Sequence, residues 1–164
     1  MTREEYIRLT DLYLTDIYRV AYSGCRNSYD AEDITQEVFE ALFRYPKAFE
    51  SDLHAKRWLI RVTLNKCKSM WRTPWKRRVD LSENAIEDGA DQVVLWENAE
   101  QEKLYSALRK LPLKYAQIIH LYYFEDMKAK DIADLLHISE SAASTRLKRG
   151  RDMLKKFMEG EAYE

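Results

Sequence analysis

The 164-residue sequence has few glycines and prolines: four and three, about a third of the usual share. A β-sandwich needs both residue types at its many turns, so this scarcity nearly excludes a turn-rich β fold. Hydrophobic residues make up 46% of the chain and charged residues 34%. This composition allows a modest core without disulfides, and it predicts a mostly helical protein with mixed charge on its exposed faces.

Long apolar runs, metal motifs and catalytic motifs are also missing. No run approaches the roughly 20 residues of a membrane span, and the N-terminus lacks the pattern of a secretion signal, so we expect a cytoplasmic protein without membrane insertion. Cys25 and Cys67 have no cysteine or histidine at zinc-site spacing, which predicts reduced, buried thiols and no metal. No Gly-rich phosphate loop or nucleophile motif occurs. We therefore expect no catalytic residue, no cofactor and no enzymatic activity.

Charge divides the chain into three parts. Residues 1–79 carry a net charge of +4, residues 80–100 carry −7 with no Lys or Arg, and residues 101–164 carry +2. Two positive modules around an acidic connector are typical of a chain that meets a polyanion in two places. Ordinary solvated faces joined by an acidic linker are the alternative.

Helical periodicity breaks at Pro46, Pro74 and Pro112, because proline removes a backbone donor and clashes with the preceding turn. The apolar spacing predicts helices at residues 3–25, 30–45, 55–71, 128–136 and 140–158. Two more helices should begin near residue 96 and at Pro112, which we expect to be a first helical residue. The expected inward residues of the first three helices are Tyr6, Leu9, Tyr13, Ile17, Val20, Gly24, Ile34, Val38, Phe39, Leu42, Phe43, Leu59, Val62 and Met70. We predict domains at 1–75 and 99–160, joined by a flexible acidic linker at 76–98.

Residues 130–146 have the pattern of a helix-turn-helix. We expect Ile132, Ala133 and Leu136 to face the second helix. Ile138 should fill the turn, and Ser139 should cap the second helix. Six Lys or Arg against one acid between Ser141 and Met158 are typical of a helix in a DNA major groove. The alternative is a surface helix whose basic residues suit the negative end of its dipole.

The helix expected at 55–71 and the residues after it combine cations with aromatic rings. Cations neutralise phosphates and aromatic rings hold unstacked bases, so this mixture suits nucleic acid. Core packing is the commoner fate of a tryptophan on an amphipathic helix, and we expect it for Trp58. For Trp71 and Trp75 both roles stay open.

The helix expected from Asp30 presents acidic side chains outward, at Glu32, Asp33 and Glu37. Carboxylates in a first turn also favour the positive end of the helix dipole. An acidic face does not suit DNA, so it is either a solvated side or a protein-docking surface. As a docking surface, it would let one module bind a protein and nucleic acid from different sides.

Three blocks resemble the extracytoplasmic-function (ECF) sigma factors, the compact specificity subunits of bacterial RNA polymerase: residues 30–39, 58–72 and 111–151. The resemblance covers nearly the whole chain. It implies an all-α fold, with a region 2 helical bundle that docks on polymerase and recognises the minus-ten element. A region 4 four-helix domain with the helix-turn-helix would read the minus-thirty-five element. The chain departs from the family at Ser69, where an acid is usual, and at Ala142, Ala143, Thr145 and Gly150.

The resemblance also implies site residues and partners. The candidate polymerase-binding residues are Asp30, Glu32, Asp33, Gln36 and Glu37. The candidate minus-ten residues are Arg61, Asn65, Lys66, Ser69 and Arg72. The candidate minus-thirty-five residues are Ser141, Ser144, Thr145, Arg146, Lys148 and Arg149. Implied partners are core RNA polymerase, promoter DNA and an anti-sigma factor, since only a short acidic tail at 159–164 extends beyond the two modules.

The sequence therefore predicts an alternative sigma factor that directs core RNA polymerase to a restricted promoter set. A stand-alone helix-turn-helix regulator of operator DNA is one alternative. Such a regulator needs a dimer interface, and the sequence has no extended heptad pattern that would indicate one. A helical interaction protein without DNA function is a second, and its binding would not depend on salt. An enzyme is the third, and it needs a catalytic constellation.

Overall fold

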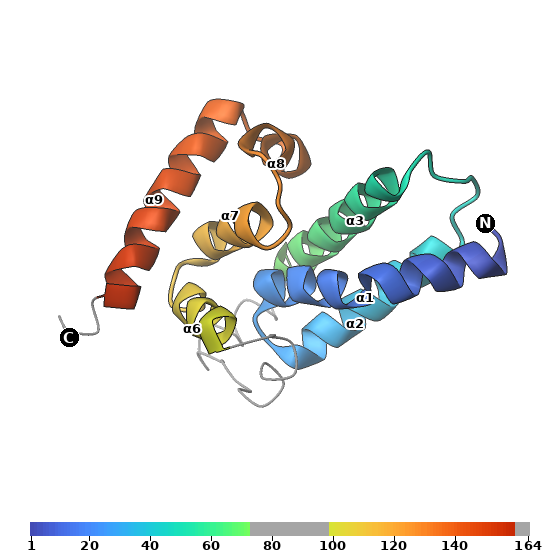
Figure 1. Cartoon of the computed structure of the whole chain (residues 1–164), viewed down its shortest axis with the longest axis horizontal. Coiled ribbons are helices and arrows are strands. Elements are labelled where there is room, and N and C mark those ends of the chain that lie inside the picture. Colours follow the sequence, from blue (N-terminus) through green and yellow to red (C-terminus); the bar gives the residue numbers. More distant parts are fainter. Residues whose placement is uncertain (73–98, 160–164) are drawn as a thin grey trace. The chain divides into compact units, whose positions relative to one another are not determined.

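The computed structural model describes residues 1–72 and 99–159, and every regular element in these ranges is an α-helix (Figure 1). The prediction of an all-α fold is confirmed. The chain divides into two compact units, one N-terminal and one C-terminal. The predicted linker at 76–98 and Trp75 lie outside the described residues, and the exact domain boundaries stay a prediction.

Helices α1 (Arg3–Cys25), α2 (Ser28–Phe43) and α3 (Asp52–Arg72) form the N-terminal unit. Polar side chains determine where α1 and α2 begin. The Thr2 hydroxyl accepts the Glu5 N–H at 3.1 Å, and the Asn27 side chain accepts the Asp30 N–H at 2.8 Å. Because Asn27 is the cap, α2 begins at Ser28 rather than near Asp30 as predicted.

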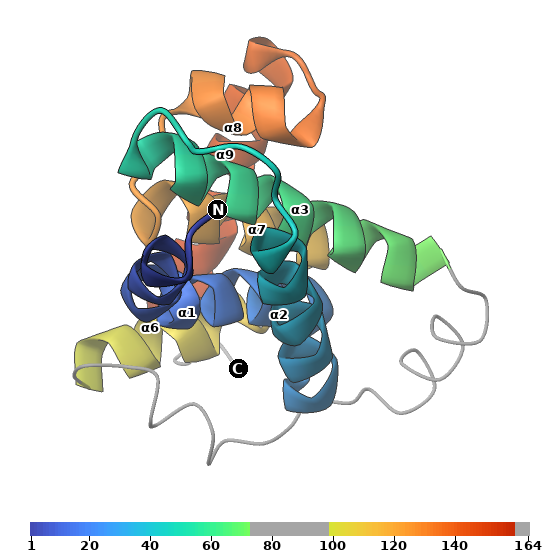
Figure 2. The ribbon, with the colours of Figure 1, turned by 90° about the vertical axis from the view of Figure 1, so that its right-hand side faces the viewer.

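The three helices of this unit lie against one another in both views (Figures 1 and 2). Most of the predicted core is buried, including Leu9, Tyr13, Ile17, Val20, Ile34, Val38, Phe39, Leu42 and Leu59. Burial of this apolar surface supplies the main driving force for the bundle. The remaining faces of α2 and α3 carry the charged residues and stay available for binding.

Polar contacts join α1 to both ends of α3. Arg8 on α1 donates to the two carboxylate oxygens of Asp52, at 2.8 and 3.0 Å. These hydrogen bonds from Arg8 hold the pKa of the Asp52 carboxyl below its usual value. At the other end, the Trp71 Nε1–H donates to the Gly24 carbonyl at 2.7 Å. The direction of α3 across α1 is therefore specified by hydrogen bonds as well as by apolar packing.

The C-terminal unit contains α6 (Ala99–Leu108), α7 (Leu113–Tyr123), α8 (Ala129–Leu136) and α9 (Glu140–Glu159). Helix α9 packs on both α7 and α8. Gly150 of α9 lies against Ile119 of α7, so that a Cβ at Gly150 would be 3.1 Å from Ile119 Cγ1. The absence of a side chain at Gly150 is what lets α7 and α9 approach this closely.

Some expected placements are wrong. Phe43 is 66% exposed as the last residue of α2, although its ring makes a T-shaped contact with Tyr6 at a centroid distance of 5.3 Å. Pro112 is the N-cap of α7 and not its first residue, since its ψ of 148° is extended. Leu135 rather than Leu136 is buried in α8. Two residues of α3 are only partly buried, Val62 and Met70.

Cys25 and Cys67 are buried and free of disulfides, as predicted. Burial raises the pKa of the Cys67 thiol to about 12, so the thiol stays protonated at neutral pH. Across residues 1–72 and 99–159, none of the helices combines the length and the apolar character needed to cross a membrane.

Candidate nucleic-acid interface

The turn between α8 and α9 has the geometry of a helix-turn-helix. His137 ends α8 in the left-handed conformation, with φ 60° and ψ 44°. The N–H of Ile138 donates to the Ala133 carbonyl at 3.0 Å, which closes the turn. The Ser139 hydroxyl then accepts the Ala142 N–H at 3.0 Å and caps α9, as the sequence predicted. These contacts orient α9 relative to α8.

One side of α9 forms an exposed polar surface, here called the recognition face: Ser141, Ser144, Thr145, Lys148 and Arg149. These residues are three or four positions apart and therefore share a side of the helix. Arg146 is partly buried and belongs to a different side, so it is set apart from the other five predicted residues. Asp152 continues the same line one turn later, and the exposed basic residues Arg151, Lys155 and Lys156 lie beside and beyond it on α9.

One exposed side of α3, here called the minus-ten face, comprises Arg61, Asn65, Lys68, Ser69 and Arg72. Four of the five predicted minus-ten residues belong to it. Lys68 was not among the predicted site residues, although its helical spacing from Asn65 and Arg72 is the signal that identifies it. Lys66 is the exception among the predicted residues. It is partly buried and faces α2.

The five candidate polymerase-binding residues of α2 lie on two sides of that helix. Asp30, Asp33 and Glu37 line a groove toward α3, whereas Glu32 and Gln36 are exposed outside it. Asp30 has a structural contact as well, because its carboxylate accepts a hydrogen bond from the Asn27 side chain at 2.7 Å.

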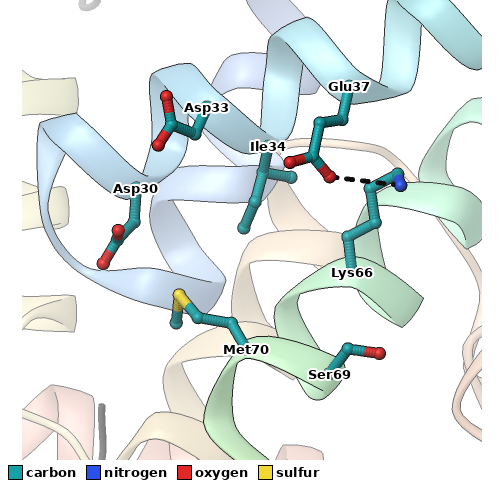
Figure 3. Close-up of a pocket in the computed structure, with 7 residues that line it drawn as sticks. All are labelled: Asp30, Asp33, Ile34, Glu37, Lys66, Ser69 and Met70. Atoms are coloured by element: carbon teal, nitrogen blue, oxygen red, sulfur yellow. Dashed lines mark ion pairs between the residues drawn. The ribbon is translucent and has the colours of Figure 1, made fainter. Parts of the chain in front are cut away.

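The α2–α3 groove has a volume of about 400 Å³ and is lined by Asp30, Asp33, Ile34, Glu37, Lys66, Ser69 and Met70 (Figure 3). Lys66 from α3 reaches toward Glu37 on α2, and its Nζ lies 3.3 Å from Glu37 Oε1. The sequence assigned these two residues to different partners, polymerase and DNA. The structure brings them together as an ion pair.

Trp58 and Trp71, both in the described part of the N-terminal unit, have different surroundings. Trp58 is partly buried and joins an aromatic cluster with Tyr45 and Phe49, at ring-centroid distances of 5.0 and 5.7 Å. Its predicted packing role is therefore borne out in part. The indole N–H of Trp71 donates a hydrogen bond to the Gly24 carbonyl, which gives Trp71 a structural role. Trp75 lies outside the described residues.

Known proteins match the two units in order along the chain. The family model for Sigma-70 region 2 covers residues 9–77, and that for Sigma-70, region 4 covers residues 101–154. The RNA polymerase sigma factor NccH of Alcaligenes xylosoxydans xylosoxydans is 30% identical, over 76% of this chain and 71% of NccH. This chain belongs to the ECF sigma factors. The ECF RNA polymerase sigma factor SigW of Bacillus subtilis is 28% identical, over 94% of the chain and 89% of SigW.

Solved structures share the fold of this ECF sigma factor. The sigma factor RpoE from Bartonella quintana, in complex with the anti-sigma factor NepR, superposes with a TM-score of 0.73 at 20% identity. That match covers 95% of this chain and 98% of RpoE. CnrH, in complex with the cytosolic domain of CnrY, has a TM-score of 0.67 at 22% identity. The family assignment confirms the predicted function, an alternative sigma factor that directs transcription initiation. The assignments of individual site residues stay predictions.

Proposed function

We propose that this sigma factor divides promoter recognition between its units, with α9 reading the minus-thirty-five element, α3 engaging the minus-ten element and α2 docking on core RNA polymerase. The observation that carries this proposal is the exposed recognition face, which the turn at His137 and the Ser139 cap present beside α8. A helix of this kind fits the major groove of B-DNA, whose base edges distinguish all four base pairs.

On the recognition face, Arg149 and Lys148 differ in what they can read. A guanidinium makes two hydrogen bonds to one guanine, whereas an ammonium acts mainly as a point charge toward phosphate. Arg149 is therefore the candidate for base readout, and Lys148 for a phosphate contact that adds affinity on any sequence. The hydroxyls of Ser141 and Ser144 are candidates for either role.

The minus-ten face combines three cations with two uncharged polar residues, Asn65 and Ser69. Arg61, Lys68 and Arg72 would neutralise phosphates of the captured strand, and the amide of Asn65 would hydrogen-bond an exposed base edge. The nearby rings of Tyr45 and Phe49 are stacked on each other at 4.1 Å, and an extruded base would have to compete with that stacking.

For polymerase docking, the acidic α2 surface suits a basic surface on the partner, because complementary charge speeds encounter and excludes wrong partners. Glu32, Gln36 and Asp33 are exposed and are the foremost candidates for direct contact. Asp30 would contribute less, since its carboxylate already serves the cap of α2.

Control in trans by an anti-sigma factor is part of the proposal, supported by the structural relative RpoE, whose structure contains the anti-sigma factor NepR. We further propose that the protein acts in the cytoplasm and contributes no catalysis of its own. Polymerisation chemistry would then belong entirely to core polymerase.

Run-off transcription with purified core polymerase on pooled genomic promoter fragments, with and without this protein, tests the proposal. We expect new, discrete transcripts that require the protein. Glu32→Lys should reduce their yield by weakening polymerase binding while leaving helical content unchanged. Absence of transcripts, combined with tight binding of the protein alone to a duplex, would instead support the stand-alone operator regulator.

A further inference from the structure

The ion pair between Glu37 and Lys66 joins the helix assigned to polymerase with the helix assigned to DNA. We propose that, in the absence of polymerase, Glu37 holds the Lys66 ammonium in the α2–α3 groove and so keeps it from DNA phosphate, and that docking of polymerase on α2 releases it. This inference rests on the proposed function. It assigns Glu37 a positioning role that couples the two binding events.

Lys66 differs from the other cations of α3 in its surroundings. Its side chain is 32% exposed and paired with Glu37, whereas Arg61, Lys68 and Arg72 are exposed and make no ion pair with a described residue. Asp30 and Asp33 line the same groove (Figure 3). The Glu37 carboxylate, 3.3 Å from the Lys66 ammonium, favours its position in the groove and opposes the approach of a phosphate, and Asp30 and Asp33 add negative charge farther along α2.

The same pair is weak enough to be exchanged. Glu37 is 58% exposed, so water and salt screen its attraction to Lys66. Pairs of this kind change an equilibrium by about two- to fivefold. A basic side chain of polymerase that engages Glu37 would compete directly with Lys66. The lysine, with its flexible four-carbon stem, could then turn toward the minus-ten face, whose Asn65 is its neighbour in the chain and whose Ser69 is one turn away.

Such competition makes the coupling reciprocal. If polymerase binding frees Lys66 for DNA, then DNA that binds Lys66 must also favour polymerase binding by the same factor. The sigma factor alone would consequently bind single-stranded DNA less tightly than its positive α3 surface suggests.

The test compares Glu37→Gln with Glu40→Gln in the full chain. Both changes remove one negative charge from α2, but Glu40 is exposed one turn beyond the groove and makes no ion pair with a described residue. Binding to a fluorescein-labelled, mixed-sequence single-stranded 12-mer is measured at low ionic strength. We expect Glu37→Gln to bind about two- to fivefold more tightly than Glu40→Gln.

Two further arms identify the cause. In a Lys66→Gln background, the difference between the two variants should vanish, because no ammonium remains to be released. With saturating core polymerase, on fork DNA from a promoter found by run-off transcription, the difference should vanish again because docking has already engaged Glu37. Circular dichroism checks that each variant keeps its helices.

Three results would overturn the inference: equal affinity of the two variants in the free chain, a difference that persists without Lys66, or a difference that persists with polymerase. The second would indicate simple repulsion between Glu37 and DNA. Failure of the wild-type complex with polymerase to bind any promoter fork would instead refute the proposed function, whatever the free-chain affinities are.

Discussion

Helices α3 and α9 each carry an exposed basic surface, but their electrostatic surroundings differ. Beside α3, the carboxylates of Asp33 and Glu37 line the adjoining groove, and one of them pairs with Lys66. On α9, Lys148 and Arg149 make no ion pair with a described residue. The comparison agrees with the proposal that the N-terminal unit moderates its own attraction to DNA, and it predicts that the recognition face binds duplex without prior rearrangement.

The two units also differ in how their helices are held. Hydrogen bonds from Arg8 and from Trp71 tie α1 to α3 at both ends of α3. In the C-terminal unit, the close contact of Gly150 with Ile119 brings α7 and α9 together. Apolar packing should therefore determine the stability of the C-terminal unit more directly, and the following variants test that difference.

Ile119→Ala should have the largest effect. Ile119 is fully buried and faces Gly150, which has no side chain to fill the cavity that truncation leaves. We expect a loss of about 2–5 kcal/mol in the free energy of unfolding. Hydrogen exchange followed by mass spectrometry should show faster exchange in α7 and α9 and unchanged exchange in α1 to α3.

Leu59→Ala is the matched control in the other unit, since Leu59 is also fully buried. Its effect should be confined to α1, α2 and α3. Equal acceleration of exchange in both units for either variant would contradict the prediction that the two domains are independent.

Arg149→Ala tests whether the recognition face reads bases of the minus-thirty-five duplex. Loss of a bidentate base contact should weaken binding to the cognate minus-thirty-five duplex by about 1–3 kcal/mol, measured by fluorescence anisotropy. Lys148→Ala provides the comparison, with a smaller loss that is the same on cognate and unrelated duplexes. If Arg149→Ala weakened binding to both duplexes equally, Arg149 would contact phosphate rather than a base.

Trp71→Phe tests the hydrogen bond at the end of α3. An aromatic ring is kept, although phenyl is smaller than indole, and the Gly24 carbonyl loses its 2.7 Å donor. We expect a decrease of about 1 kcal/mol in the free energy of unfolding, from urea titration at constant m-value. Weakened binding to minus-ten DNA with unchanged stability would show that Trp71 contacts bases instead.

Asp52→Asn should have the smallest effect, because the ion pair with Arg8 is exposed. Folding lowers the pKa of Asp52 from 3.8, so its carboxylate stabilises the fold above pH 3.8 and loses this effect as the pH falls through the folded pKa. Wild type should exceed the variant in stability at pH 7, and the two should converge on acidification. A difference that is constant with pH would exclude ionisation of Asp52 as its cause.

Local signals in the sequence predicted the helices, most of the core and the helix-turn-helix well. The Ser139 cap and the buried stripe of α1 follow from the residue type and from helical spacing, which depend on near neighbours only. The errors at Phe43 and Pro112 are at helix ends, where one residue decides between packing and solvent. Candidate site residues could be chosen as members of a family pattern, but their neighbours across helices could not.

The sequence by itself determined the all-α class, the order of the two modules and the family, because composition, periodicity and motif spacing are properties of the chain alone. Only the tertiary structure decided that Lys66 forms an ion pair with Glu37, that Trp71 donates a hydrogen bond to the Gly24 carbonyl and that Gly150 packs against Ile119. These residue pairs are 29 to 47 positions apart. Contacts over such separations depend on how whole helices pack, and no local pattern encodes that arrangement.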